Sequence, residues 1–251
     1  MTQLIDLSVS LTNRDKSARP PQIEYISHEK SANRSAIAYG IKPKDFTEGK
    51  YAAIEHITLT THDTTHLDAP YHYYPTSEGK PAKTIDQVPL EWCYCDGVVL
   101  DFVHKTQGEN ITAEELQASL THINYDLKPL DIVLIRTDIY KHYGEKGFED
   151  LHPGVSRGAT LWLIEQGIKV MGIDAWGWDR SLGAMIKDLK TGNRKQFWES
   201  HYLGKEREYC HLERLANLDR IPFPFGFKVA VFPIKIEKAS AGWVRAVAIV
   251  E

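Results

Sequence analysis

One short segment constrains this chain more than any other. His62-Asp-Thr-Thr-His66-Leu-Asp68-Ala-Pro-Tyr-His72 carries three histidines and an aspartate at even spacings of four, two and four. Side chains alternate along an extended chain, so these four would project from one face of a strand. A helix does not bring them together, because Asp68 would turn by about 200° from His66 at 3.6 residues per turn. The segment is therefore predicted to be extended.

The same segment must also bend. Four residues of strand span roughly 13 Å, whereas the donor atoms around one metal ion lie about 2.0–2.2 Å from it. The bend is expected at Asp63-Thr64-Thr65, between the first two histidines. The pattern is not the HExxH motif of zincins, because it lacks the glutamate and the helix. It indicates a bent segment that derives from a strand.

Three histidines and a carboxylate on one face predict a metal site, because burying them without a cation would leave polar groups unpaired. Imidazole and carboxylate suit Zn²⁺, Mn²⁺ or Fe²⁺. His62, His66 and Asp68 are the predicted ligands, and they leave coordination positions open for a cation that acidifies water and polarises a carbonyl. His72, with a pKa expected near neutrality, is the predicted catalytic residue that moves the proton.

The remaining histidines are expected to be ordinary hydrogen-bonded or exposed side chains. They are His28, His56, His104, His122, His142, His152 and His211.

Composition excludes several other classes of protein. A net charge of −4 and a pI near 6.3 provide no basic face for nucleic acid. No segment reaches the roughly 20 apolar residues of a membrane span, and Met1–Leu11 does not resemble a signal peptide. The three cysteines, Cys93, Cys95 and Cys210, cannot all pair within one chain and are interpreted as reduced structural thiols. A cytoplasmic protein is expected, with a small-molecule substrate and no nucleic-acid or membrane partner.

Hydrophobic patterning predicts one mixed α/β domain over residues 1–251. Strands are expected at Ile5–Leu11, Ala53–Thr61, Gly97–Val103, Asp131–Asp138, Lys169–Ala175, Lys228–Ile234 and Trp243–Val250.

Three further stretches complete this outline. The capping box Thr112-Ala-Glu-Glu115 predicts the start of a helix, and a second helix is expected over Ser156–Gln166, ending at Gly167. Ser181–Leu218 is polar and helix-prone. Thr12–Lys50 is polar with weak periodicity, and is expected to be an extended arm or loop region that can embrace another subunit.

The metal segment resembles the HxGTHxDxPxH signature of the putative cyclase family, which includes bacterial kynurenine formamidase and isatin hydrolase. The matching positions are His62, Thr65, His66, Asp68, Pro70 and His72. Ile5-Asp-Leu-Ser8, Lys169–Asp174 and Ala241–Val247 are also similar to the opening, central and closing strands of the family. The resemblance thus covers nearly the whole chain.

This resemblance implies a swivelling β/β/α-type fold, with a mixed sheet or flattened barrel and flanking helices. It also implies two more metal ligands, His201 and Glu213, twelve residues apart, with Glu213 on a helix. Asp68 would then bridge two ions, although some relatives use one. Family members form dimers or tetramers, so a homodimer or homotetramer is expected.

Two positions depart from the family pattern. Thr64 stands where the family has glycine, so the bend must form without glycine's freedom at positive φ, and a β-bulge conformation is expected there. Trp176 and Trp178 stand where relatives have small residues. They either line a substrate pocket that accepts aromatic groups or belong to the core.

The expected function is metal-dependent hydrolysis of an amide, lactam or lactone bond in a small cyclic or aromatic substrate, of the arylformamidase or cyclic amidase type. Two alternatives stay open at this point. One is a metal-dependent lyase or cyclase that uses the same cation, Zn or Mn, to stabilise an enolate. The other is a non-catalytic metal-binding protein.

Overall fold

The central strands of the fold are apolar on both faces. The computed structural model describes residues 1–13, 16 and 20–251. In strand β7 (Tyr94–Asp101), Val98 and Leu100 pack into one hydrophobic cluster, whereas Val99 packs into a second cluster on the opposite face. Strand β9 (Ile132–Arg136) divides its side chains in the same way. Such strands require cover on both faces, which is typical of a parallel α/β sheet.

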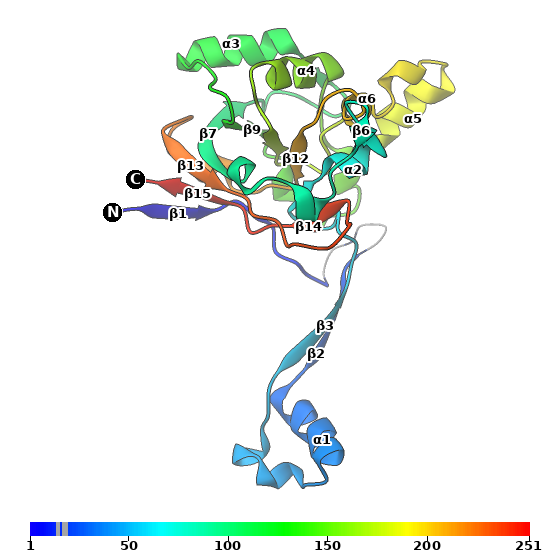
Figure 1. The fold of residues 1–251 in the computed structure, drawn as a ribbon, viewed down its shortest axis with the longest axis vertical. Helices are drawn as coiled ribbons and strands as arrows, with labels where there is room; N and C mark the ends of the chain where they lie inside the picture. Colours follow the sequence, from blue (N-terminus) through cyan, green and yellow to red (C-terminus); the bar gives the residue numbers. More distant parts are fainter. Residues whose placement is uncertain (14–15, 17–19) are drawn as a thin grey trace. The chain divides into compact units, whose positions relative to one another are not determined.

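Nine strands form one mixed sheet in the order β1-β15-β13-β7-β9-β11-β12-β4-β14 (Figure 1). The remaining members are β1 (Gln3–Asp6), β4 (His66–Asp68), β11 (Val170–Ile173), β12 (Cys210–Glu213), β13 (Phe227–Ala230), β14 (Ala241–Trp243) and β15 (Val247–Val250). The central strands β7, β9, β11 and β12 run parallel, and every other pairing is antiparallel. The predicted mixed α/β fold is confirmed.

The sheet curls strongly. Strands β14 and β15 are seven positions apart in the sheet order, which would be about 33 Å in a flat sheet. Only residues 244–246 connect them, and the four Cα steps from Trp243 to Val247 reach at most about 14 Å. The two ends of the sheet must therefore approach each other. The bond from Val244 N–H to the Thr65 carbonyl ties the short link to the segment before β4.

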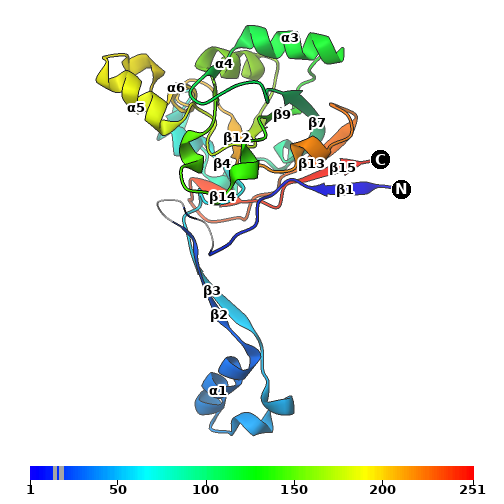
Figure 2. The ribbon, with the colours of Figure 1, turned by 180° about the vertical axis from the view of Figure 1, so that it is seen from behind.

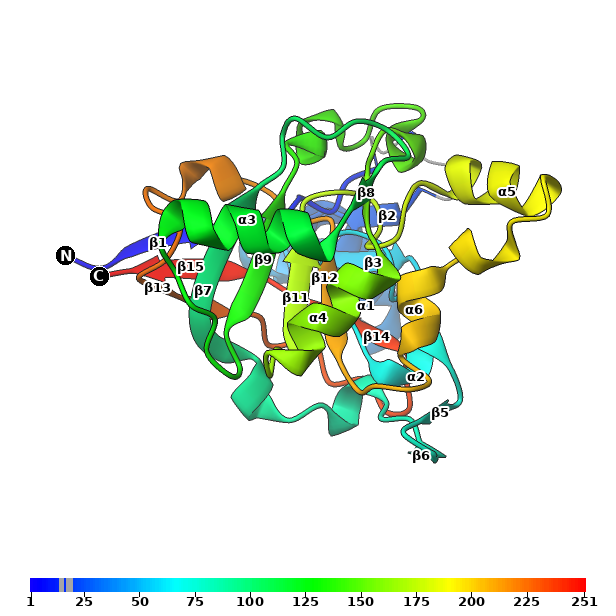
Figure 3. The same ribbon diagram turned by 90° about the horizontal axis from the view of Figure 1, so that it is seen from above.

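Helices cover one face of this sheet. Figure 3 shows α3 (Ala113–Ile123) and α4 (Arg157–Glu165) lying over the central strands. The predicted capping box at Thr112 and Glu115 is confirmed, since each residue's side chain accepts a hydrogen bond from the other's backbone N–H. The second predicted helix is also confirmed, and Gly167 follows it with a φ of 89°.

Shorter elements complete the main unit, which comprises residues 1–10 and 61–251. Its other helices are α2 (Pro70–Tyr73), α5 (Leu182–Lys190) and α6 (Glu199–Leu203). Its small strands are β5 (Thr76–Ser77), β6 (Lys80–Pro81), β8 (Asn110–Ile111) and β10 (Gly154–Val155). Its 3₁₀ turns are Ile85–Gln87, Leu90–Trp92, Ile139–His142, Phe148–Asp150, Arg194–Gln196 and Leu218–Arg220. Figure 2 shows the terminal strands β1 and β15 side by side, as their pairing requires.

Residues 11–60 form a second compact unit. It contains the antiparallel pair β2 (Gln22–Ile26) and β3 (Ile54–Thr58), the helix α1 (His28–Tyr39), and 3₁₀ turns at Pro43–Asp45 and Thr47–Gly49. The strand predicted within Ala53–Thr61 is confirmed, whereas the helix in the expected arm region was not predicted. Part of that region, residues 14, 15 and 17–19, lies outside the described residues. The division into one domain with an arm stays a prediction.

Two sequence predictions were wrong near the end of the chain. Trp243–Val250 is not one strand but two, because the chain leaves one edge of the sheet as β14 and re-enters near the other as β15. The polar stretch Ser181–Leu218 contains α5 and α6 but also the buried strand β12. Pairing with β11 and β4 on both sides outweighs the weak local helix propensity there.

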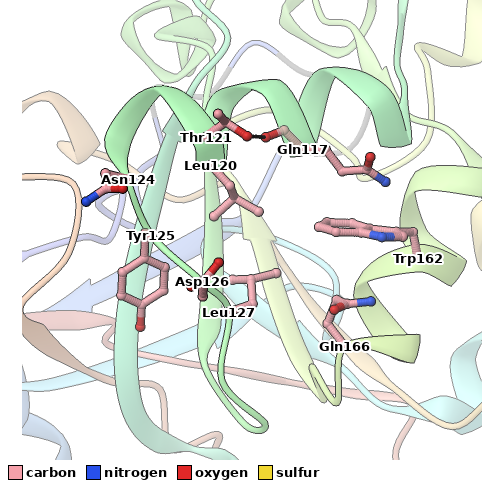
Figure 4. A pocket seen from close by; sticks show the side chains of 9 residues that line it. All are labelled: Gln117, Leu120, Thr121, Asn124, Tyr125, Asp126, Leu127, Trp162 and Gln166. Carbon is pink, nitrogen blue, oxygen red and sulfur yellow. Dashed lines mark hydrogen bonds between the residues drawn. The ribbon is translucent and has the colours of Figure 1, made fainter.

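An open groove of about 370 Å³ lies on the helical side, between α3, the loop after it and α4 (Figure 4). It is lined by Gln117, Leu120, Thr121, Asn124, Tyr125, Asp126, Leu127, Trp162 and Gln166. This lining includes one carboxylate and no histidine or cysteine, so the groove offers no cluster of metal-ligating groups. No helix among the described residues has the length and apolar character needed to cross a membrane.

Gly154, in β10, tests the close packing of this strand against the backbone of Asp179 and Arg180. A Cβ at this position would collide with backbone atoms of Asp179 and Arg180, which cannot move as a flexible side chain can. We expect Gly154→Ala to lower the free energy of unfolding by roughly 1–3 kcal/mol, as overpacking does. Gly158→Ala is the matched control, because nothing lies within 4 Å of that Cβ, and a helical alanine should stabilise α4. Chemical denaturation measures both, and an unaffected Gly154→Ala would contradict the packing.

Candidate metal centre

Two antiparallel neighbours, β4 and β12, build the floor of the site. Their register places His66 opposite Glu213 and Asp68 opposite His211. Because side chains alternate along strands, these four polar side chains share one face, while Leu67 and Leu212 pack into the core on the other. The even spacing of His66 and Asp68 therefore has the predicted consequence.

Asp68 is the centre of the cluster. Its side chain is completely buried, and its Oδ1 lies 2.8 Å from His62 Nδ1 and 3.4 Å from His66 Nε2. Its Oδ2 lies 2.9 Å from His211 Nε2 and 3.7 Å from His72 Nε2. The structure thus brings together His62, His66, Asp68 and His72 around one carboxylate.

The two residues added by the family resemblance join the same cluster. Glu213 Oε2 lies 3.6 Å from His66 Nε2, and Glu213 Oε1 lies 3.8 Å from His201 Nε2. One donor atom from each of Asp68, His201, His211 and Glu213 lies within 4.8 Å of the others, and His62, Asp68 and His72 form a second such group. Asp68 belongs to both groups, so its two oxygens are placed to bridge two cation positions.

Hydrogen bonds determine which ring nitrogen His66 and His201 each present to the cluster. His66 Nδ1 lies 2.9 Å from the Thr64 carbonyl, which only accepts, so Nδ1 carries the hydrogen and Nε2 offers its lone pair to the cluster. His201 Nδ1 lies 2.5 Å from the Asp179 carboxylate, which also accepts from the backbone N–H of His201. A carboxylate behind a histidine is a common support for a metal ligand. Sequence reasoning did not identify Asp179.

Several buried atoms fit a cation. His66 Nε2 is buried without a hydrogen-bond partner in the part of the chain that the structure describes, and Asp68 Oδ1 faces the ring nitrogens of His62 at 2.8 Å and His66 at 3.4 Å. A buried polar atom without a partner is costly, and both atoms point to the same cluster of nitrogen and carboxylate donors. This donor set matches Zn²⁺ or Mn²⁺ and contains no thiolate. The residues therefore fit a divalent metal.

His211 corrects the sequence prediction. It was grouped with the ordinary histidines, yet it is fully buried and its Nε2 contacts Asp68 at 2.9 Å and Glu213 at 3.2 Å. The expected helix for Glu213 hid this relation, since residues two apart diverge on a helix. On strand β12 they share a face. The spacing rule that identified His66 and Asp68 would have identified this pair as well.

The bend at Thr64 also differs from the expectation. The residue is not in a β-bulge conformation but in the left-handed region, with a φ of 58°. This conformation costs an L-residue roughly 1–2 kcal/mol, and a β-branched one adopts it rarely. The turn before His66 is thus made by a strained threonine.

The structure distinguishes the two roles, substrate pocket or core, that the sequence left open for Trp176 and Trp178. Trp178 is fully buried, donates its indole N–H to Thr160 Oγ1, and gives its backbone N–H to Glu213 Oε1 at 3.0 Å. Its side chain therefore belongs to the core, and its backbone orients a candidate ligand. Trp176 is half-buried and lies against the Arg214 guanidinium.

Burial and neighbouring charges shift the pKa values of His211, Glu213 and Asp68 in opposite directions. Burial disfavours the charged form of His211, but its hydrogen bonds with Asp68 and Glu213 outweigh this and raise its pKa to about 9. Burial also opposes ionisation of Glu213, yet its bond to His211 lowers the pKa to about 2. The pKa of Asp68 falls well below its usual value because the surrounding histidines outweigh burial.

His72 behaves differently from the other histidines. Burial lowers its pKa to about 3, and the Asp68 carboxylate offsets this only in part. The expectation of a pKa near neutrality was therefore wrong, and His72 is a neutral base at pH 7. Its side chain is 22% exposed and that of His62 is 27% exposed, whereas Asp68 and His66 have no exposed side-chain surface. A substrate can approach the cluster from the side of His62 and His72.

Known proteins with similar sequences or folds include a formamidase and isatin hydrolases. The chain is 29% identical over 192 residues to kynurenine formamidase of Bacillus cereus, covering 76% of this chain and 77% of that protein. The fold resembles isatin hydrolase A from Ralstonia solanacearum with a TM-score of 0.78 and 24% identity, over 100% of this chain and 92% of that one. An isatin hydrolase bound to the product analogue thioisatinate gives a TM-score of 0.77 and 21% identity, over 99% and 92% of the two chains.

A family model also matches most of the chain. Residues 5–180 match the model of the family described as "Putative cyclase". This range includes the whole His62–His72 segment, and His201, His211 and Glu213 follow it. The chain belongs to the cyclase family.

Proposed function

We propose that this chain is a metal-dependent hydrolase of an amide, lactam or lactone bond in a small cyclic or aromatic substrate. The observation that carries the proposal is the completely buried Asp68 carboxylate, which contacts histidines from two separate segments and belongs to two potential cation positions. The names of the similar proteins, a formamidase and isatin hydrolases, support hydrolysis at a carbonyl carbon.

The metal would be held by two groups of ligands. His62 and Asp68 supply donors to one position, and Asp68, His201, His211 and Glu213 to the other, with His66 Nε2 beside both carboxylates. We propose Zn²⁺ or Mn²⁺, as one or two ions, because imidazole and carboxylate ligands suit both. A divalent cation at this place supplies a Lewis acid that lowers the pKa of water and polarises a carbonyl.

The protein's own residues carry the proton and orient the ligands. Neutral His72 accepts the proton from the attacking water with Nε2 and returns it to the leaving nitrogen or oxygen. Its ring lies 3.9 Å from that of His62, at the partly exposed side of the cluster. Asp179 and the Thr64 carbonyl hold His201 and His66 in the tautomers that present Nε2. Trp176, which is half-buried, is the proposed contact for an aromatic substrate.

We propose further that the protein is a homodimer or homotetramer in which residues 11–60 contact a second copy. An isolated strand pair is marginally stable in water, yet all five residues of β3 are exposed. This unit also exposes several large apolar side chains, namely Tyr25, Ile37, Tyr39, Ile54 and Ile57. Such a surface is typical of one that a partner covers.

A cytoplasmic location is part of the same proposal. Cys93, Cys95 and Cys210 are all free among the described residues, and free thiols are typical of a reducing compartment. Burial raises the pKa of Cys210 well above its usual value, which keeps this thiol protonated and unreactive.

Removing the metal and replacing His72 test the catalytic proposal. Chelation should abolish hydrolysis of N-formyl aromatics, isatin-like lactams or lactones, and adding Zn²⁺ or Mn²⁺ should restore it. His72→Ala should lower kcat by about 10²–10⁴-fold and leave metal bound at the position of Asp68, His201, His211 and Glu213, because His72 acts on the proton and is not in that group of donors. His142→Ala, at an exposed ring, is the control.

Solvent ¹⁸O in the product distinguishes hydrolysis from a lyase reaction. Full activity in a metal-depleted sample would refute the catalytic scheme.

The charge on His211 predicts how the stability of the metal-free protein depends on pH. Its folded pKa of about 9 lies above the unfolded value of 6.5, so its stabilising contribution is complete below pH 6.5 and is lost as pH rises through 9. The free energy of unfolding should therefore fall between pH 6.5 and 9. Urea denaturation across this range measures the effect, and His211→Gln should flatten the profile. An equal slope in both proteins would contradict the assignment.

Light scattering tests the proposed assembly. The full chain should scatter as a dimer or tetramer, and a variant with residues 11–60 replaced by a short Gly/Ser linker should scatter as a monomer. Denaturation of the same variant shows whether the main unit remains folded. An unchanged oligomer after the deletion would refute the role of this unit.

A further inference from the structure

The turn between His62 and His66 has a backbone conformation that its central residue disfavours. Thr64, at its centre, has a φ of 58°, which disfavours a β-branched side chain. Strain of this kind persists only where the surroundings impose it. Thr64 itself accepts a hydrogen bond from His66 Nδ1 through its carbonyl, and further contacts lie on the residues to either side of it.

One residue, Arg214, contacts both sides of the turn. Its carbonyl oxygen accepts a hydrogen bond from Thr65 Oγ1 at 2.6 Å. Its guanidinium Nη1 lies 3.6 Å from the carboxylate of Asp63. Thr64 is thus bracketed by two contacts to the same residue, one through the backbone and one through the side chain.

Arg214 is itself held in place. It is only 4% exposed, its backbone N–H donates to the Ala175 carbonyl at 2.9 Å, and its guanidinium carbon lies 3.7 Å from the centre of the Trp176 ring. Its Nε has no hydrogen-bond partner among the residues that the structure describes. A buried guanidinium needs a counter-charge, so the Asp63 carboxylate and the face of Trp176 secure its position.

The contact between Arg214 and the turn matters for the site because both partners lie next to candidate metal ligands in the sequence. Arg214 follows Glu213 directly, while Asp63 follows His62. Strand pairing already fixes His66 and Asp68 beside the ligands of β12, so holding Asp63 and Thr65 against Arg214 ties the remaining ligand, His62, to the same strand end. The turn and the strand end come from parts of the chain about 150 residues apart.

We propose that Arg214 is a positioning residue that latches the His62–His66 turn to the end of β12 and pre-organises the metal ligands. The latch holds Thr64 in a left-handed conformation that glycine would adopt without strain. This inference rests on the proposed metal site and concerns how that site is kept in shape. It assigns Arg214 no contact with the metal or with the reacting atoms.

A double-mutant cycle tests the latch through Zn²⁺ affinity, measured on full-length protein by competition with a chelating dye. Arg214→Met should weaken Zn²⁺ binding by about 10–100-fold, as loss of a residue that supports ligands does. Thr64→Gly alone should change the affinity by less than about 3-fold. In the Arg214→Met background, Thr64→Gly should recover most of the loss, because glycine makes the turn without strain.

Two further variants keep the test decisive. Arg245→Met is the matched control, since Arg245 is exposed and its guanidinium pairs with Asp6, which is not part of the turn. Asp63→Asn addresses the other end of the ion pair, and should weaken Zn²⁺ binding in the same direction even if Arg214→Met does not fold.

The possible outcomes distinguish a failure of the latch from a failure of the proposed metal site. A wild-type protein that binds no Zn²⁺ would refute the metal site and the latch together. Unchanged affinity in both Arg214→Met and Asp63→Asn would refute the latch alone. Unchanged affinity with a raised KM would also overturn it, because Arg214 would then act on the substrate. Loss of affinity without recovery by Thr64→Gly would show that Arg214 does not support the turn.

Discussion

The site depends on one buried negative charge. A carboxylate with no exposed surface, as in Asp68, is stable only when positive charge and hydrogen bonds surround it. Here His62 and His211 approach its two oxygens at 2.8 and 2.9 Å. In the absence of a divalent ion, protons on these histidines provide the compensation, which is why burial fails to lower their pKa values. A cation and these protons therefore compete for the same place.

The curled sheet makes this arrangement possible. Because β4 pairs with β12 and β14, a strand of only three residues is enclosed between two neighbours and can carry charged side chains on one face. The opposite face of the same strand carries Leu67, which is fully buried in the core. The ligands are thus fixed by backbone pairing on both sides, a more rigid support than a surface loop gives.

The shared face of His66 and Asp68 could be predicted from the sequence because the information is local. Even spacing on an extended chain places His66 and Asp68 on one face whatever the rest of the fold does. The capping box at Thr112 is local in the same sense. His211 was missed because a helix was expected around Glu213 and the strand exists only through pairing with distant segments. Asp179 was missed for a related reason, since its contact with His201 joins a loop residue to helix α6, and no periodicity reveals that the two are close.

The short link between β14 and β15 has a consequence for the order in which the fold forms during synthesis. Residues 244–246 connect strands at opposite ends of the sheet, so the curl is complete only after the last part of the chain has been added. Contacts of such long sequence separation form slowly. The segment that contains Thr65 receives one of its hydrogen bonds from Val244, and His62 Nε2 lies 2.9 Å from Ser240 Oγ. The nascent chain therefore carries the histidines early but gains their final geometry late, which delays tight capture of a cation until the topology is correct.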